Sequence, residues 1–419
     1  MASIRKRSMT EPITIDFSGG NVDVDAICIK NKKLLQKSGS GNLYPLHHLA
    51  KNASFQNFRV GVCCFPGAMT KVGRSDEDAG TPAHFVVTSN TEVEAKINFT
   101  IKYFPESLEI INCKDELVGH VAAAKSTLVV LKSILEVVPE EDTYTLRKGT
   151  IAHSAACRHD HEGKKIMQHI IQNYPDTLTT LDISDSLPLH ICALDGTLDM
   201  FMIMMTTNPG ALNWVAGELG TVAHLACWNY SSEDYSILNY ICQFHPECLA
   251  IPDINGRLVL HRLLSRRDTE KYTMESMLAV YTAYPNAIRI KDNTELLPLH
   301  SLIQDGYDER ERPNETLLLP SLRFLLKEYP DAVVNMLPPD GFKYEHLPES
   351  AIRIILRVNP NLDMKKYHRL NWRHRRVAVW LARGRLSHPE QNHADLAHIY
   401  LRKLRQLGDD MLREIISFV

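Results

Sequence analysis

The chain has 419 residues, of which 44% are hydrophobic and 23% are charged, and its formal net charge is −3. This length exceeds one ordinary domain core and predicts either several domains or a repeat array, and the composition is that of a folded chain. No apolar run reaches the roughly 18 residues that a transmembrane helix needs, so no transmembrane helix is expected.

Residues 1–41 are expected to form a partly disordered or capping lead-in. The opening MASIRKRSMTEP is basic, but no apolar core follows it, so a secretory signal is not expected. The nine cysteines are scattered without the spacing of a disulfide framework. This pattern favours reduced thiols and a cytoplasmic location, with the nucleus as the other option.

Residues 42–362 are predicted to form a repeat array. Histidines return at intervals of 33–39 residues, and a proline follows each of them after 19–30 residues. From that proline to the next histidine the gap is nearly constant, at 14–18 residues, and His346 with Pro360 looks like a shortened ninth copy. The repeat histidines are His47, His84, His120, His153, His190, His224, His261 and His300.

Each repeat predicts two helices. Small and aliphatic residues after the histidine suit a short, crowded helix, and a variable polar turn follows. The next segment is amphipathic, as in KKIMQHIIQNYP at 164–175, and proline ends that helix because it cannot continue one. The stretch beyond the proline is expected to be extended, with turn residues at its tip.

This cycle resembles the ankyrin repeat, whose signature is Thr-Pro-Leu-His-x-Ala. The matching stretches are TPAHFV (81–86), TIAHSA (150–155), LPLHIC (187–192) and TVAHLA (221–226). The chain looks like the divergent ankyrin arrays with LPLH…YP repeats that are common in diatoms and related stramenopiles, although the Gly and Asn-Gly features of ordinary ankyrin repeats are mostly missing. The resemblance implies an all-α solenoid of about eight to nine helix-turn-helix repeats with a helical C-terminal cap. It also implies that the repeat histidines are structural and hydrogen-bond within and between repeats.

A solenoid exposes a long concave surface, which such folds use for binding. By the resemblance, positions four and five residues after each histidine line this groove, and the residues just before the histidine add loop tips to it. An exposed Trp flanked by Arg and Asp suits an interface anchor, and the alternative is that Trp228 packs over a neighbouring repeat. The candidate partner-binding residues are Arg158, Asp195, Trp228, Asn229, Tyr230, Arg266 and Asp305, with loop-tip positions Ile183, Ser184, Asn255, Arg257, Asn293 and Thr294.

Residues 363–419 are predicted to be a basic helical cap. They hold 12 Lys/Arg and 6 Asp/Glu, a net +6, and on a helix one side of the segment 364–385 is apolar while another gathers arginines with two tryptophans. The apolar side is expected to shield the last repeat. The arginines form a possible anion-binding set of Arg369, Arg373, Arg376 and Arg383.

The sequence gives no reason to expect a catalytic site or a metal site. The sequence contains no phosphate-binding Gly-x-x-x-x-Gly-Lys loop, no Gly-x-Ser-x-Gly elbow and no His-Glu-x-x-His. The stretch HSAACRHDHEG (153–163) brings together zinc-type ligands, His153, Cys157, His159 and His161. Two of these already occupy repeat positions, so we expect no metal and no cofactor.

The sequence therefore predicts a non-enzymatic, monomeric scaffold or adaptor that binds an unknown protein partner on its concave surface. The alternative is binding of a polyanion, either nucleic acid or an anionic membrane surface, through the basic C-terminal helix.

Overall fold

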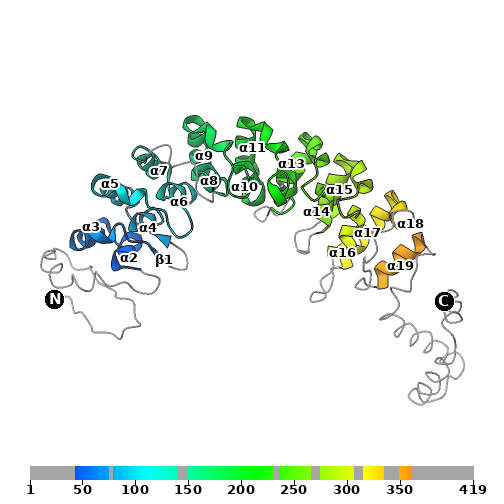
Figure 1. Ribbon diagram of the computed structural model, residues 1–419, viewed down its shortest axis with the longest axis horizontal. Coiled ribbons are helices and arrows are strands. Elements are labelled where there is room, and N and C mark those ends of the chain that lie inside the picture. The colour runs from blue at the N-terminus through cyan, green and yellow to red at the C-terminus, as the bar shows by residue number, and fades with distance from the viewer. Residues whose placement is uncertain are drawn as a thin grey trace, which may run out of the picture. The chain divides into compact units, whose positions relative to one another are not determined.

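The computed structural model describes residues 43–74, 79–138, 149–229, 236–265, 274–305, 315–334 and 349–359. These residues are mostly helical, as the sequence predicts for an all-α protein (Figure 1). The chain divides into two compact units, residues 1–259 and 260–419, which are described separately. The expected lead-in (1–41), both His346 and Pro360 of the expected ninth repeat, and the basic segment (363–419) lie outside the described residues.

The first compact unit is built from helix pairs in two layers, which Figure 1 shows from blue to green. One layer consists of the helices that carry the repeat histidines, here called histidine helices: α2 (Pro45–Asn52), α4 (Pro82–Val87), α6 (Val118–Lys125), α8 (Ile151–Ala156), α10 (Pro188–Asp195) and α12 (Val222–Ala226). The other consists of the second helices: α3 (Phe55–Cys64), α5 (Val93–Tyr103), α7 (Leu128–Leu135), α9 (His161–Asn173), α11 (Leu198–Thr207) and α13 (Ser236–Phe244). A histidine helix and the second helix that follows it pack together as a hairpin, and each helix also packs on the next helix of its own layer.

The two kinds of helix bury different faces because their side chains differ. In α8 the residues Ile151, Ala152, Ala155 and Ala156 are all fully buried, so the helix is enclosed on nearly every side. Small side chains permit this close approach of neighbouring helices. In α9 burial is confined to one stripe around Ile166, Met167 and Ile170, as an amphipathic period predicts.

In the part of the chain that the structure describes, six of the prolines that follow a second helix have a further effect that the sequence prediction missed. The chain does not run straight into an extended stretch but makes a short 3-10 turn that begins at the proline. Proline suits the first position of a helical turn because its φ is already fixed and it needs no hydrogen-bond partner. These turns are η2 (Pro66–Ala68), η3 (Pro105–Leu108), η5 (Pro175–Leu178), η6 (Pro209–Asn213) and η8 (Pro246–Ala250), with η9 (Pro285–Arg289) in the second compact unit.

The loops that lead to the next histidine helix contain little regular structure. Before α4, strands β1 (Gly73–Arg74) and β2 (Ala79–Gly80) pair antiparallel, with Gly73 opposite Gly80. Before α12, the 3-10 turn η7 (Gly217–Leu219) is enclosed by a bridge between Ala216 and Gly220.

The second compact unit continues the helical pattern. Its helices are α15 (Met274–Ala283), α16 (Pro298–Asp305), α17 (Glu315–Glu328), α18 (Asp331–Val334) and α19 (Glu349–Val358), while α14 (Val259–Leu264) begins at the boundary. Helix α17 packs on α15, α16 and α19. The hydroxyl of Tyr281 on α15 donates to the carboxylate of Glu328 on α17 at 2.9 Å.

Among the described residues, no helix is both long and apolar enough to cross a membrane. Cys64 is disulfide-bonded, which differs from the expectation that every thiol is reduced. The other cysteines in the described ranges, Cys63, Cys113, Cys157, Cys192, Cys227, Cys242 and Cys248, are free thiols.

Candidate functional site

The repeat histidines cap their own helices. In six of them the ring Nδ1 accepts a hydrogen bond from the backbone N–H three residues earlier, at the N-cap position, where helix donors otherwise lack partners. The nitrogen–nitrogen distances are 3.1 Å for Tyr44–His47, 3.1 Å for Thr81–His84, 2.9 Å for Thr150–His153, 3.3 Å for Leu187–His190, 3.1 Å for Thr221–His224 and 3.0 Å for Leu297–His300.

The same rings also bond across to the following hairpin. Each Nε2 lies within hydrogen-bond distance of a backbone carbonyl oxygen 24–35 residues further along the chain. The acceptors and distances are Lys71 (2.9 Å), Glu116 (3.0 Å), Gly149 (3.1 Å), Ser186 (3.0 Å), Trp214 (3.1 Å), Arg257 (2.8 Å), Leu296 (3.1 Å) and Ala332 (3.1 Å), for His47 to His300 in order.

These two bonds decide the protonation of the ring. A backbone N–H can only donate and a carbonyl oxygen can only accept, so Nδ1 is bare and Nε2 carries the proton. Burial lowers the pKa of His84, His190 and His300 to about 4 and also lowers the pKa of His47 and His153. A neutral ring with both nitrogens engaged is suited to holding the backbone rather than to catalysis.

The loops that receive these bonds share a turn that the sequence reasoning did not identify. In four loops an Asn or Asp side-chain oxygen accepts from the backbone N–H groups two and four residues ahead, an arrangement typical of Asx turns. The turn residues are Asn112, Asp182, Asp253 and Asp292. The third residue after each has positive φ: Asp115 (58°), Asp185 (57°), Gly256 (73°) and Glu295 (62°).

The loop geometry exposes apolar side chains at the tips. In three consecutive loops of the first compact unit, Ile183 is 70% exposed, Trp214 is 42% exposed and Ile254 is 54% exposed. The indole Nε1 of Trp214 donates to the carbonyl oxygen of Asp185 at 2.8 Å, which joins its loop to the one that carries Ile183. We call Ile183, Trp214 and Ile254 the loop-tip row.

The loops that carry this row are supported by hydrogen bonds from the preceding hairpins. Each of its loops is held by a histidine of the preceding hairpin, since Ser186, Trp214 and Arg257 supply the acceptor carbonyls. Exposed apolar residues in a row leave water on binding, and a surface that is already ordered loses little entropy in doing so.

Two of the predicted partner-binding residues are placed elsewhere by the structure, and they require a correction. Arg158 is 8% exposed, and its Nη1 donates to the carbonyl oxygens of Ala123 and Ser126 at 3.3 and 2.6 Å. Asn229 is 2% exposed, and its Nδ2 donates to the carbonyl oxygens of Ala193 and Gly196 at 3.0 and 3.2 Å. Both side chains point between hairpins, where they satisfy carbonyls at the C-terminal end of the preceding histidine helix.

A third buried donor performs the same task with a different side chain. Lys96 is fully buried, and its Nζ donates to the carbonyl oxygen of Ala50 at 3.0 Å and to the hydroxyls of Ser89 and Thr91 at 3.0 and 2.9 Å. Burial lowers the pKa of Lys96 to about 8. Ser89, which lies five residues after its histidine, itself donates to the carbonyl oxygen of Lys51 at 2.6 Å.

The remaining candidates are distributed as follows. Asp195 is exposed at the end of α10, and Trp228 is half-buried just beyond α12. Tyr230, Arg266, Arg369, Arg373, Arg376 and Arg383, together with the side chain of Asp305, lie outside the described residues.

The zinc-type cluster does not converge. His153 is engaged at both ring nitrogens, and the Cys157 thiol donates to the carbonyl oxygen of Ser154. In the described part of the chain, no group of three or more His, Cys, Asp or Glu side chains is arranged to hold a metal ion.

The sequence reasoning named Ile183 as a loop-tip position but missed Trp214 and Ile254. A signal for Ile254 was available, because it follows Asp253 as Ile183 follows Asp182. Trp214 has no such counterpart, since its loop lacks the Asx turn and uses the Ala216–Gly220 bridge instead.

Comparison with known proteins identifies no family model that matches this chain and no curated protein whose sequence matches it.

Proposed function

We propose that this chain is a divergent ankyrin-repeat solenoid that acts as a non-catalytic scaffold or adaptor. It binds a protein partner through the loop-tip row, together with Asp195 at the end of α10 and Trp228 just beyond α12. The observation that carries the proposal is the exposure of three large apolar side chains on three consecutive loops, each tied to the preceding hairpin by a buried histidine.

Several features support the repeat interpretation. The eight histidine-to-carbonyl bonds recur with the 33–39 residue period of the sequence, and within the first compact unit helices of each layer pack in chain order. A repeat array presents extended surfaces of this kind for binding. Trp side chains near the centre of an interface often contribute a large share of its binding energy, and Trp214 is on the middle of the three loops.

The proposed surface is tested by photo-crosslinking in native lysate. A benzophenone amino acid at Ile183 should capture a discrete partner, whereas the same group at Val129 should not. Val129 is a matched control because it is 55% exposed but lies on α7, in the layer of second helices. The partner identified by mass spectrometry should then bind the Ile183→Asp, Ile254→Asp double variant at least about tenfold more weakly, about 1.4 kcal/mol, with an unchanged melting temperature.

Other outcomes would favour a different function. Equal capture from Val129, or full binding by the double variant, contradicts a loop-tip site. If instead Arg373→Glu with Arg376→Glu abolishes binding to a polyanion, and that binding weakens steeply with salt, the basic C-terminal segment is the working surface.

A further inference from the structure

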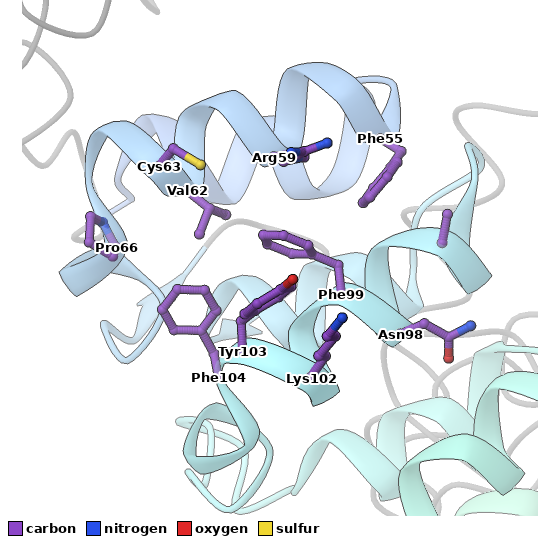
Figure 2. A pocket seen from close by; sticks show the side chains of 11 residues that line it. Phe55, Arg59, Val62, Cys63, Pro66, Asn98, Phe99, Lys102, Tyr103 and Phe104 are labelled. Carbon is purple, nitrogen blue, oxygen red and sulfur yellow. The ribbon is translucent and has the colours of Figure 1, made fainter. Parts of the chain in front are cut away.

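A second candidate binding site lies between the second helices α3 and α5, away from the loops that carry the loop-tip row. It is a pocket of ≈ 580 Å³, within the size range of ligand-binding clefts. Figure 2 shows its walls: Phe55, Arg59 and Cys63 project from α3, while Phe99, Lys102 and Tyr103 project from α5.

The floor of the pocket is aromatic. Phe99 is central, with its ring centroid 5.9 Å from that of Phe55, 4.9 Å from Tyr103 and 6.4 Å from Phe104. Tyr103 is 55% exposed, so a large part of this cluster faces solvent. An exposed aromatic cluster in a concave site suits an apolar ligand.

The rim of the pocket is basic. Arg59 and Lys102 are both exposed, and the Lys102 ammonium lies 5.2 Å from the centroid of the Tyr103 ring. None of the described residues that line the pocket is acidic. The carboxylate of Glu92 accepts from the backbone N–H of Phe55 at 2.7 Å, so it is engaged at the start of α3. The pocket therefore fits a ligand that combines apolar side chains with negative charge.

We propose that residues 11–27 of this same chain bind in the pocket as an intramolecular ligand. Their sequence, EPITIDFSGGNVDVDAI, contains four acidic residues and no basic one. Ile13, Ile15 and Phe17 alternate with polar residues, so an extended segment presents all three to the same side. The aromatic floor receives these side chains, and the rim arginine and lysine face the carboxylates.

The chain length permits this contact. Fifteen residues lie between residue 27 and residue 43, where the described structure begins, and such a linker reaches about 50 Å when extended. Helix α2 starts at Pro45 and packs directly on α3, which forms one wall of the pocket. A tethered segment binds at a high effective concentration, so even a weak contact is well populated.

The first test measures the reactivity of Cys63, a free and exposed thiol in the pocket wall. The full chain is alkylated with iodoacetamide, and modification of Cys63 is compared by peptide mass spectrometry with that of Cys113, a free, exposed thiol outside the pocket. In the Ile15→Ser, Phe17→Ser variant, the Cys63 to Cys113 rate ratio should rise about fivefold or more. Leu34→Ser with Leu35→Ser, outside the proposed ligand, should leave the ratio unchanged.

The second test supplies the ligand in trans. A fluorescein-labelled peptide of residues 9–27 is titrated against the full chain carrying Ile15→Ser and Phe17→Ser, whose own segment no longer competes. It should bind, and adding Arg59→Glu with Lys102→Glu should weaken binding about tenfold or more. The matched control is Lys132→Glu, an exposed lysine of α7 outside the pocket, which should leave the affinity unchanged.

Unchanged Cys63 reactivity in the Ile15→Ser, Phe17→Ser variant, or peptide binding that is indifferent to the Arg59 and Lys102 charges, overturns the proposal. Protection of Cys63 that grows with protein concentration also overturns it, because the occupant is then a second copy of the chain. None of these readouts depends on the loop-tip row, so the two proposals fail or succeed separately.

Discussion

The imidazole Nε2 of His84 lies 3.0 Å from the carbonyl oxygen of Glu116, which belongs to the loop of the next hairpin. The same oxygen also accepts from the backbone N–H of Asn112 at 2.9 Å, and the Asn112 side chain closes the turn between them. One carbonyl thus joins a buried histidine, a turn and the start of α6. Because His84 holds the carbonyl oxygen of Glu116, the conformation of the loop before α6 depends on the preceding hairpin. Loss of the histidine therefore affects two hairpins at once.

We expect His190→Ala and His224→Ala each to lower the free energy of unfolding by about 1–3 kcal/mol, because each leaves buried backbone groups without partners. The two rings donate to the carbonyl oxygens of Trp214 and Arg257 at 3.1 and 2.8 Å, respectively. Urea denaturation followed by circular dichroism measures both. His48→Ala, at an exposed neighbour of His47, is the control and should change little. Parent-like unfolding of both variants would contradict a structural role for the rings.

Acid should destabilise the fold through the same rings. Burial lowers the pKa of His190 to about 4 in the folded state, whereas the unfolded side chain titrates near 6.5. The unfolded state therefore binds more protons in this window, so the stability from His190 is complete above about pH 6.5 and is lost as the pH falls towards 4. The slope for one ring is about 1.4 kcal/mol per pH unit.

The test compares urea midpoints between pH 4 and pH 7 for the parent and His190→Gln, which keeps a donor but does not titrate. The variant should show a shallower loss of stability with falling pH than the parent. Identical pH profiles for parent and His190→Gln would mean that the pKa of His190 is the same in the folded and unfolded states.

Arg158→Ala should destabilise the protein by about 1–3 kcal/mol without changing partner affinity per folded molecule. The reason is that its guanidinium satisfies the carbonyls of Ala123 and Ser126 and also pairs with Asp160, whose pKa this hydrogen bond lowers. Thermal unfolding and a binding titration with the cross-linked partner separate the two effects. Asp195→Ala, at an exposed position, should change stability by less than about 0.5 kcal/mol. A binding defect in Arg158→Ala at unchanged stability would indicate that Arg158 contacts the partner after all.

Glu295→Gly should stabilise the protein by about 0.5 kcal/mol. Glu295 has φ of 62°, a left-handed conformation that costs a residue with a side chain about 1–2 kcal/mol. Glycine avoids this cost, but it loses more conformational entropy on folding, which offsets part of the gain. The exposed pair with Lys291 that is lost is worth little. Gly256→Ala, at the equivalent position of an earlier loop with φ of 73°, should destabilise instead. Denaturation midpoints test both, and a stabilising Gly256→Ala would show that the turn relaxes without strain.

The sequence by itself determined the helical class, the period and the helix ends, because these depend on local chemistry. A proline after an amphipathic stretch ends that helix wherever the stretch lies, and alanine-rich residues after His153 permit only a crowded helix. The histidines are identifiable for the same reason, since each sits three residues inside its own helix and six of them cap it from there.

The tertiary structure alone decided which variable residues face solvent. Arg158 and Asp195 occupy the same position after their histidines, yet Arg158 reaches carbonyls 32–35 residues away while Asp195 stays exposed. Their different orientation depends on how neighbouring hairpins stack, and a repeat period carries no information on that. Trp214 became a surface candidate only because its loop crosses to Asp185, a contact between hairpins. At such positions, the packing of two neighbouring hairpins decides whether a side chain is buried or exposed. The sequence of one hairpin alone therefore does not specify it.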